Sequence, residues 1–242
     1  MYTILTVLIL AIFLYTIIPY LLSFGLNWRV YRHNHKSKKI AFTFDDGPDP
    51  FYTPLLLDLL NKFNIKATFF VVGSRAELYP EIILRMHQEG HLIGIHNYVH
   101  SSNWFTLPWK IRRDLDYSAA VINGITGTKP IYYRPPWGLM NLFDFFLLKS
   151  YRIILWSVMV GDWKENPGVE KIKARLLKKI KHGDIILLHD CGDTPGADFD
   201  APMNTINALK EVLSEMQAKG IQSVRVDELW GKPILSNQRI TF

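Results

Sequence analysis

The sequence has almost no cysteine and, in its first 28 residues, no charged side chain. Cys191 is the only cysteine among 242 residues, which excludes an intrachain disulfide and a zinc site built from cysteines. No internal repeat or low-complexity segment stands out. With 48% hydrophobic and 21% charged residues, the chain is too apolar to be disordered and long enough for one large domain or two small ones.

The uncharged run from Met1 to Trp28 is rich in Leu, Ile, Val, Phe and Tyr. It exceeds the roughly 20 residues that a helix needs to cross a bilayer core, so residues 1–28 are predicted to form one transmembrane anchor. A cleaved signal peptide is the alternative, but its apolar part is shorter and ends at an Ala-x-Ala type of cleavage site, which does not follow here. We therefore expect the anchor to stay on the chain.

Five basic residues follow this run, in a segment from 29 to 39 that we interpret as a basic juxtamembrane linker. They are Arg29, Arg32, Lys36, Lys38 and Lys39. By the positive-inside rule, their charge favours a cytoplasmic location for the domain that follows. The formal charge of the whole chain is +6, which is typical of proteins that meet lipid head groups, cell-wall polymers or nucleic acid, and equally of an ordinary solvated surface. Nucleic-acid binding is disfavoured because, outside the linker, basic residues form no stripe with interleaved aromatics.

Beyond the linker, short apolar runs alternate with segments of helical periodicity. The predicted strands are residues 40–44, 67–72, 92–95, 131–133, 153–156, 184–188 and 223–226, and the predicted helices are residues 52–63, 77–89, 109–124, 142–150, 169–182 and 201–219. Gly90, Gly124, Gly183 and Gly220 stand where helices are expected to end. The alternation predicts a parallel α/β fold, either a barrel or a doubly wound sheet, with its binding site at the carboxyl ends of the strands.

Chemically useful side chains follow five of these predicted strands. In chain order they are Asp45 and Asp46 in TFDDGP, His96 and His100 in HNYVH, Arg134 in RPPWG, Asp162 and Trp163 in VGDW, and His189 in LLHD. Taken singly, each has an ordinary explanation: a turn or helix cap for the aspartates, core or surface positions for the histidines, and a turn for the arginine. Their shared position after successive strands favours one common site.

Two imidazoles and one carboxylate make a three-ligand site for zinc or a similar divalent ion, with an open position for water. His96 and His100 are four residues apart, and one of the two aspartates completes the set while its neighbour stays free. The free carboxylate is suited to act as general base, with Arg134 lowering its pKa, and a histidine across the substrate is suited to protonate a leaving amine. These side chains predict amide or ester hydrolysis, whereas the active site of a phosphoesterase commonly holds two bridged metal ions.

The five strings resemble the motifs of the polysaccharide deacetylase family, the carbohydrate esterases typified by chitin and peptidoglycan deacetylases. The resemblance runs from about Lys39 to Leu229 and keeps the order and approximate spacing of the family's motifs. It implies a distorted (β/α) barrel of seven or eight strands over residues 40–242, preceded here by the transmembrane helix. The implied activity is metal-dependent removal of N-acetyl groups from N-acetylhexosamine units of a peptidoglycan or chitin-like polymer.

The same resemblance implies a role for each matching residue. Asp45 corresponds to the general base and His189 to the catalytic acid. Arg134 corresponds to the arginine that holds the base in position. Asp46 corresponds to the metal carboxylate, with His96 and His100 as the other ligands, and the ion is expected to be zinc, with cobalt or nickel as alternatives. The backbone N–H near Trp137 corresponds to the oxyanion donor. Trp163 and Leu187 correspond to residues that line the acetyl pocket, although both also suit an ordinary core.

Two positions depart from the family's pattern. Asn97 replaces the usual Ser or Thr after the first metal histidine, and an amide still forms local hydrogen bonds. Met159 stands where many members carry an aspartate that raises the pKa of the catalytic-acid histidine, and a thioether supplies no charge. We therefore expect His189 to be less readily protonated, unless Asp162 or Asp190 substitutes, and a Met159→Asp variant to change the pH profile.

Two hypotheses of function follow. The first is an active, single-pass membrane protein whose catalytic domain lies outside the cell with its N-acetylated glycan substrate. This location conflicts with the basic linker, whose charge favours a cytoplasmic domain. The second is a catalytically silent protein that binds envelope glycan and keeps the metal pocket, with Met159 as its support. Acetate release by the protein and by an Asp45→Asn variant distinguishes them.

Overall fold

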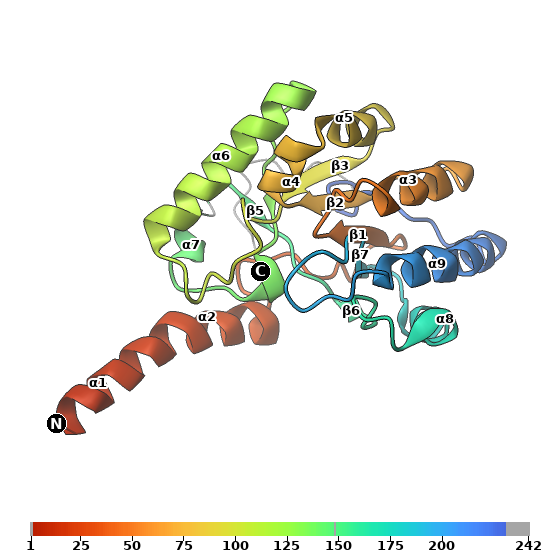
Figure 1. Cartoon of the computed structure of the whole chain (residues 1–242). Helices are drawn as coiled ribbons and strands as arrows, with labels where there is room; N and C mark the ends of the chain where they lie inside the picture. The colour runs from red at the N-terminus through yellow and green to blue at the C-terminus, as the bar shows by residue number, and fades with distance from the viewer. Residues whose placement is uncertain (1, 148, 231–242) are drawn as a thin grey trace.

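The computed structural model describes residues 2–147 and 149–230. Over these residues, seven strands form one fully parallel sheet in the order β5-β4-β3-β2-β1-β7-β6. The strands are β1 (Ala41–Asp45), β2 (Thr68–Val71), β3 (Leu92–Ile95), β4 (Tyr132–Tyr133), β5 (Arg152–Ile153), β6 (Val158–Met159) and β7 (Ile185–His189). The sheet curls into a half-barrel with helices packed around its outside (Figure 1), which confirms the predicted barrel class.

The central strand β1 explains why the sheet forms where it does. All five residues of AFTFD are buried, as expected for a parallel strand covered on both faces. It pairs with β2 on one side and with β7 on the other, and the second ladder places Asp45 opposite His189. Two side chains of the predicted site therefore lie side by side where β1 and β7 end.

The helices that cover the sheet carry their apolar side chains on one face. They are α3 (Tyr52–Lys62), α4 (Gly73–Leu78), α5 (Pro80–Gln88), α6 (Pro108–Thr126), α7 (Asp144–Leu147), α8 (Gly168–Lys179) and α9 (Ala201–Ala218). In α6, for example, the buried apolar residues are Ile111, Leu115, Ala119 and Ile122, at spacings of three and four.

Most expected elements are present, and the differences have local causes. The expected helix over residues 77–89 is two helices, because Pro80 begins α5 after Tyr79 leaves helical geometry. Residues 223–226 form only an isolated bridge to Ile40 instead of a strand, whereas the unexpected β6 has two residues. Gly124 lies inside α6, which ends at Thr126 and is capped by Gly127 with φ of 69°.

The apolar N-terminal segment is one continuous helix from Tyr2 to Gly25, long and apolar enough to cross a membrane. It consists of α1 (Tyr2–Ile12), a π-helical turn η1 (Phe13–Ile17), α2 (Ile18–Tyr20) and a second π-helical turn η2 (Leu21–Gly25). Its first half projects away from the domain (Figure 1) and is exposed from Tyr2 to Leu14, whereas Thr16, Pro19 and Ser23 in its second half are buried against the domain.

The segment after this helix also packs on the barrel. Tyr31 forms a parallel bridge with Ile154, and His33 forms an antiparallel bridge with Asp184. Arg32 donates hydrogen bonds to the backbone carbonyls of Phe24 and Trp156. The second half of the helix and the chain that follows it are therefore attached to the domain at several points.

Candidate active site

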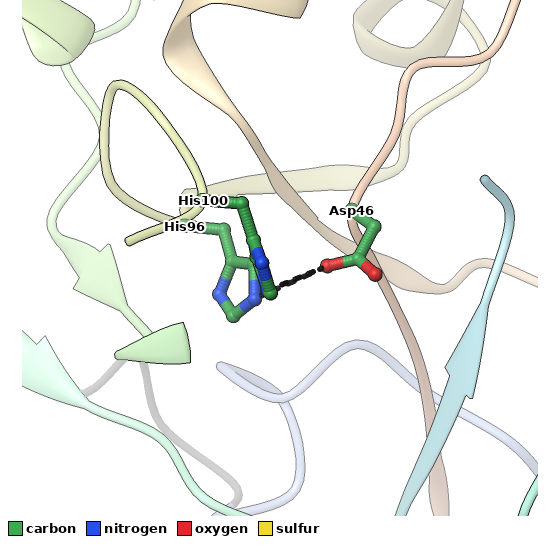
Figure 2. Close-up of side chains that lie close together, drawn as sticks. All are labelled: Asp46, His96 and His100. Carbon is green, nitrogen blue, oxygen red and sulfur yellow. Dashed lines mark ion pairs between the residues drawn. The ribbon is translucent and has the colours of Figure 1, made fainter. Parts of the chain in front are cut away.

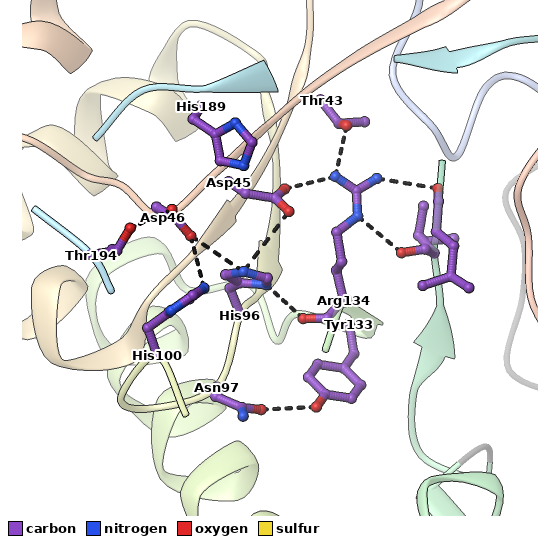
Figure 3. Close-up of polar contacts among 12 residues, drawn as sticks. Thr43, Asp45, Asp46, His96, Asn97, His100, Tyr133, Arg134, His189 and Thr194 are labelled. Carbon is purple, nitrogen blue, oxygen red and sulfur yellow. Dashed lines mark hydrogen bonds and ion pairs between the residues drawn. The ribbon is translucent and has the colours of Figure 1, made fainter. Parts of the chain in front are cut away.

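The two aspartates occupy a tight turn at the end of β1. Asp46 has a positive φ of 78°, and the Gly47–Pro48 peptide bond is cis. A Cβ atom at Gly47 would lie 2.3 Å from a carboxylate oxygen of Asp190, so only glycine fits there. The turn sends the side chains of Asp45 and Asp46 toward different partners (Figure 3).

Asp46, His96 and His100 come together, although about 50 residues separate the aspartate from the histidines (Figure 2). Asp46 Oδ1 lies 3.4 Å from His96 Nε2 and 3.2 Å from His100 Nε2. The candidate ligand atoms of the three residues all lie within 4.8 Å of one another, and Asp46 Oδ1 is buried without a hydrogen-bond donor among the described residues. A buried anionic oxygen facing two imidazole nitrogens is a donor set that fits a divalent cation.

Neighbouring groups orient these three side chains. His96 Nδ1 lies 2.7 Å from the backbone carbonyl of Arg134, which leaves Nε2 facing Asp46. The Thr194 hydroxyl donates a 2.7 Å hydrogen bond to Asp46 Oδ2, the oxygen that faces away from the histidines. Such contacts fix the tautomer of a ligating histidine and the rotamer of a ligating carboxylate.

Charge and burial keep Asp46 and His100 in the forms that bind cations. Burial by itself raises the pKa of Asp46, but the imidazole of His96, 3.4 Å away, and those of His189 and His100 outweigh it, so that the pKa lies well below its usual range. Burial and the neighbouring His96 lower the pKa of His100 to about 4. Asp46 is therefore an anion and His100 a neutral imidazole near neutral pH.

Asp45 turns away from Asp46 Oδ1 and pairs with Arg134 (Figure 3). Arg134 is fully buried and donates to Asp45 Oδ1 at 2.7 Å, to the Thr43 hydroxyl at 2.8 Å and to the carbonyl of Ile154 at 3.0 Å. The other oxygen, Asp45 Oδ2, lies 3.8 Å from His96 Nε2. One oxygen of Asp45 is thus held by the guanidinium, while the second faces His96.

His189 faces the same space from β7 and is oriented by Asp162. Its backbone N–H donates to Asp162 Oδ2 at 2.8 Å, and its Nδ1 lies 3.2 Å from Asp162 Oδ1. Burial by itself lowers the pKa of His189, but the charge and hydrogen bond of Asp162, with smaller contributions from Asp46 and Asp45, raise it to about 9.

This contact removes the expected effect of Met159. The sequence predicts a less readily protonated His189 unless Asp162 or Asp190 substitutes. Asp162 does so, because the turn after β6 brings its carboxylate to Nδ1 of the histidine ring. Asp190 turns the other way and accepts a hydrogen bond from the Thr53 hydroxyl at 2.5 Å. Met159 lines the pocket with no charge to offer.

A cavity of about 330 Å³ opens over these groups. Trp137, Trp163 and Leu187, the three residues expected to contact substrate, all line it. The ring of Trp137 packs edge-on against His100 with 4.3 Å between ring centroids, and the ring of Trp163 packs against His189 at 5.6 Å. Leu187 is also part of the core, so it serves packing and pocket together.

Two pocket residues come from the N-terminal helix, where sequence reasoning did not look for them. Tyr20 and Phe24 line the cavity, and the ring of Phe24 packs edge-on against Trp156 at 5.5 Å. The available signal is the recurrence of the hydroxyl residues Thr16, Tyr20 and Ser23 at spacings of four and three in the second half of the helix. Thr194 and the following turn of residues 195–197 were also missed, because a Thr-Pro-Gly turn is typical of ordinary loops.

The arrangement matches known proteins over most of the chain. Residues 32–142 match the family model described as polysaccharide deacetylase. A peptidoglycan-N-acetylglucosamine deacetylase of Bacillus cereus is 39% identical over 202 residues, which are 81% of this chain and 89% of that protein. A chitooligosaccharide deacetylase of a Bradyrhizobium species is 32% identical over 194 residues, covering 77% of this chain and 88% of that one.

A solved structure has the same fold. The crystal structure of the Bc1960 peptidoglycan N-acetylglucosamine deacetylase, in complex with 4-naphthalen-1-yl-N-oxidanyl-benzamide, aligns with a TM-score of 0.77 and 29% sequence identity. The alignment covers 87% of this chain and 96% of that chain.

Proposed function

Because the chain belongs to the polysaccharide deacetylase family, we propose that it hydrolyses N-acetyl groups on the hexosamine units of a cell-envelope polysaccharide, with the residues of this pocket as its catalytic groups. One observation carries the assignment of roles. The candidate ligand atoms of Asp46, His96 and His100 lie within 4.8 Å of one another, with Asp45 beside them on Arg134 and His189 across the cavity.

Asp46, His96 and His100 are proposed to hold the divalent metal that the family uses. A cation on these three ligands would polarise the acetyl carbonyl and make a bound water more acidic. Zinc suits two imidazoles and a carboxylate, and cobalt or nickel suits them as well. Thr194 and the carbonyl of Arg134 would keep the ligands in place by their hydrogen bonds.

The proton transfers are assigned to Asp45 and His189. Asp45 Oδ2 would accept a proton from the attacking water, while Arg134 keeps Oδ1 occupied and the carboxylate in position. His189 has Nδ1 on Asp162, so its Nε2 is the atom that would protonate the leaving sugar nitrogen. The raised pKa of His189 keeps that proton available near neutral pH.

The remaining pocket residues are assigned to the acetyl group. Leu187 and Trp163 would contact its methyl, whose burial contributes roughly 1 kcal/mol. The backbone N–H of Trp137 would stabilise the oxyanion that develops on the carbonyl. Trp137 has a positive φ of 55°, an uncommon conformation that fixes the direction of its peptide groups.

The substrate is proposed to be peptidoglycan or a chitin-like polymer of N-acetylhexosamine. Peptidoglycan lies outside the cytoplasm, so this substrate places the domain outside the cell on a single-pass anchor, although the basic residues after the helix favour the opposite orientation. The Arg32 guanidinium is bound by carbonyls of Phe24 and Trp156, so one of the five charges is part of the fold. Digestion of intact cells with an impermeant protease tests the orientation.

The activity is tested by acetate release from peptidoglycan and chitin oligomers treated with the full chain in detergent and zinc. We expect one acetate for each new free amine, and a loss of about 10²- to 10⁴-fold in Asp45→Asn. Asp58→Asn, an exposed change on α3, controls for the substitution itself. If the unaltered protein releases no acetate from any such glycan, the result would favour a catalytically silent glycan-binding protein. The contact of Asp162 with His189 removes the argument from Met159 for that alternative.

A further inference from the structure

The side of the domain beside the N-terminal helix exposes large apolar side chains. Four of them form a surface that we call the apolar collar: Phe105, Leu142, Phe143 and Phe146, which are 89%, 47%, 38% and 62% exposed. Single exposed apolar residues are common on soluble proteins, but a contiguous apolar surface marks contact with a partner or a membrane.

The collar adjoins the part of the helix that is attached to the domain. The backbone N–H of Leu142 donates to the carbonyl of Tyr15 at 2.9 Å, and the rings of Phe143 and Phe146 pack against each other at 5.3 Å. Phe105 follows Trp104, whose ring packs edge-on against Tyr20 at 6.3 Å. Figure 1 shows α7 and the loop before α6 on the side of the domain from which the helix emerges.

The length of the described helix that does not contact the domain indicates how deep the collar would lie in a bilayer. Tyr2–Leu14 is exposed and measures about 20 Å at roughly 1.5 Å per residue. The hydrocarbon core of a bilayer is about 30 Å thick. If this helix spans the core, part of the attached half from Tyr15 to Phe24 lies below the membrane surface, and the collar residues that contact it lie there too.

We propose that the catalytic domain sits in the surface of a lipid bilayer through the apolar collar, so that the active-site pocket opens at the level of the head groups. This inference rests on the membrane span of the proposed function and not on the chemistry of the site. Lipid is the occupant because the collar is continuous with a helix of membrane-span composition. Trp109 and Arg113, both exposed at the start of α6, add the aromatic and basic side chains that the membrane interface favours.

The location of the pocket gives the membrane contact of the collar a functional consequence. Tyr20 and Phe24 form part of the pocket lining and belong to the same attached half of the helix as Tyr15. With the collar in the interface, the catalytic groups therefore lie at the level of the head groups, a short distance above the hydrocarbon core. A glycan would be deacetylated close to the membrane surface and not in the outer layers of the envelope.

The seat is tested with fluorophores on single cysteines and lipids that carry bromine on their acyl chains. Cys191 is 1% exposed, so a thiol-reactive bimane labels an introduced surface cysteine in the full chain. The variants are Phe146→Cys and Phe105→Cys in the collar, Ile9→Cys in the helix, and Leu84→Cys on α5, which Figure 1 places away from the helix. Each is reconstituted into vesicles of phosphatidylcholine and phosphatidylglycerol.

We expect brominated lipids to quench the label at both collar positions and at Ile9→Cys, and to leave Leu84→Cys unquenched. Quenching at Ile9→Cys alone would overturn the seat while leaving the membrane span intact. Absence of quenching at Ile9→Cys would overturn both. Acetate release by vesicles of unaltered protein reports separately on the proposed function, because lipid quenching does not depend on catalysis.

Discussion

Asp45 and Asp46 are neighbours in sequence but have different surroundings. Asp45 belongs to β1 and accepts a hydrogen bond from buried Arg134. Asp46 has a positive φ of 78°, which turns its carboxylate toward His96 and His100. The backbone of the turn therefore places one carboxylate beside the guanidinium of Arg134 and the other beside two imidazoles. That separation allows one aspartate to act as a base while the other ligates.

The contact between Asp162 and His189 predicts a shift in the pH profile. The pKa of His189 is raised to about 9 against the effect of burial, with Asp162 as the principal charge. Asp162→Asn removes that charge and so lowers the pKa of His189. Since the acid must be protonated to act, activity should then be lost at lower pH than in the unaltered protein. The measurement is kcat against pH at saturating zinc.

The matched control is Asp116→Asn, an exposed carboxylate on α6 that should leave the profile unchanged. Met159→Asp adds a charge to the pocket lining and should move the alkaline limb to higher pH. An alkaline limb that stays in place in Asp162→Asn would contradict the role given to His189.

Thr194 predicts an effect on metal affinity. Its hydroxyl donates to Asp46 Oδ2 at 2.7 Å, and Thr194→Val keeps the shape of the side chain without the donor. We expect zinc to bind about 10- to 100-fold more weakly, as for other groups that orient a ligand. Competition with a chromophoric chelator measures this, with Thr128→Val at an exposed position as the control. Equal affinity in both variants would show that Thr194 does not position Asp46.

At the scale of elements, Arg134 joins the strands around the site. It follows β4 and donates to Thr43 and Asp45 in β1 and to the carbonyl of Ile154 after β5. Arg134→Met leaves the carboxylate of Asp45 buried without its partner, which typically costs about 3–5 kcal/mol of the free energy of unfolding. Urea unfolding in detergent checks this. Exposed Arg112→Met should cost under about 1 kcal/mol, and equal losses would contradict the prediction.

The N-terminal helix predicts a change in substrate affinity. Phe24 lines the pocket and packs against Trp156, so Phe24→Ala removes part of the wall without touching the proposed catalytic groups. We expect KM for chitin oligomers to rise about 5- to 10-fold, corresponding to roughly 1 kcal/mol of aromatic contact, with kcat little changed. Ile9→Ala in the exposed half should change neither constant. An unaltered KM in Phe24→Ala would show that this part of the helix does not contribute to substrate binding.

The strand ends were predictable from sequence because each motif is local. In a parallel sheet the carboxyl ends share one edge, so TFDDGP, HNYVH and LLHD had to meet there once the alternation of strands and helices was recognised. The two-residue strand β6 was not predictable, because two residues carry no periodicity. The pairing of Asp162 with His189 depends on how the turn after β6 directs the carboxylate. The sequence does not specify the direction of that side chain.

At the scale of the whole molecule, the sequence correctly indicates an apolar helix before a barrel but not their relation. Thr16, Pro19 and Ser23 face the domain, and their burial attaches the helix beside the proposed catalytic groups. Composition alone assigns all 28 residues to lipid, because a hydropathy average does not show which few residues of a helix face a protein domain. The structure thus joins two parts that the sequence predicts as separate: the anchor and the site.

The metal content of purified variants tests the division of labour between the two aspartates most directly. Asp46→Asn, Asp45→Asn and the unaltered full chain are each dialysed against zinc and analysed by elemental mass spectrometry. We predict about one zinc per chain in the unaltered protein and in Asp45→Asn, and almost none in Asp46→Asn, because the candidate ligand atoms that lie together belong to Asp46, His96 and His100. Zinc retained by Asp46→Asn and lost from Asp45→Asn would contradict the proposed site.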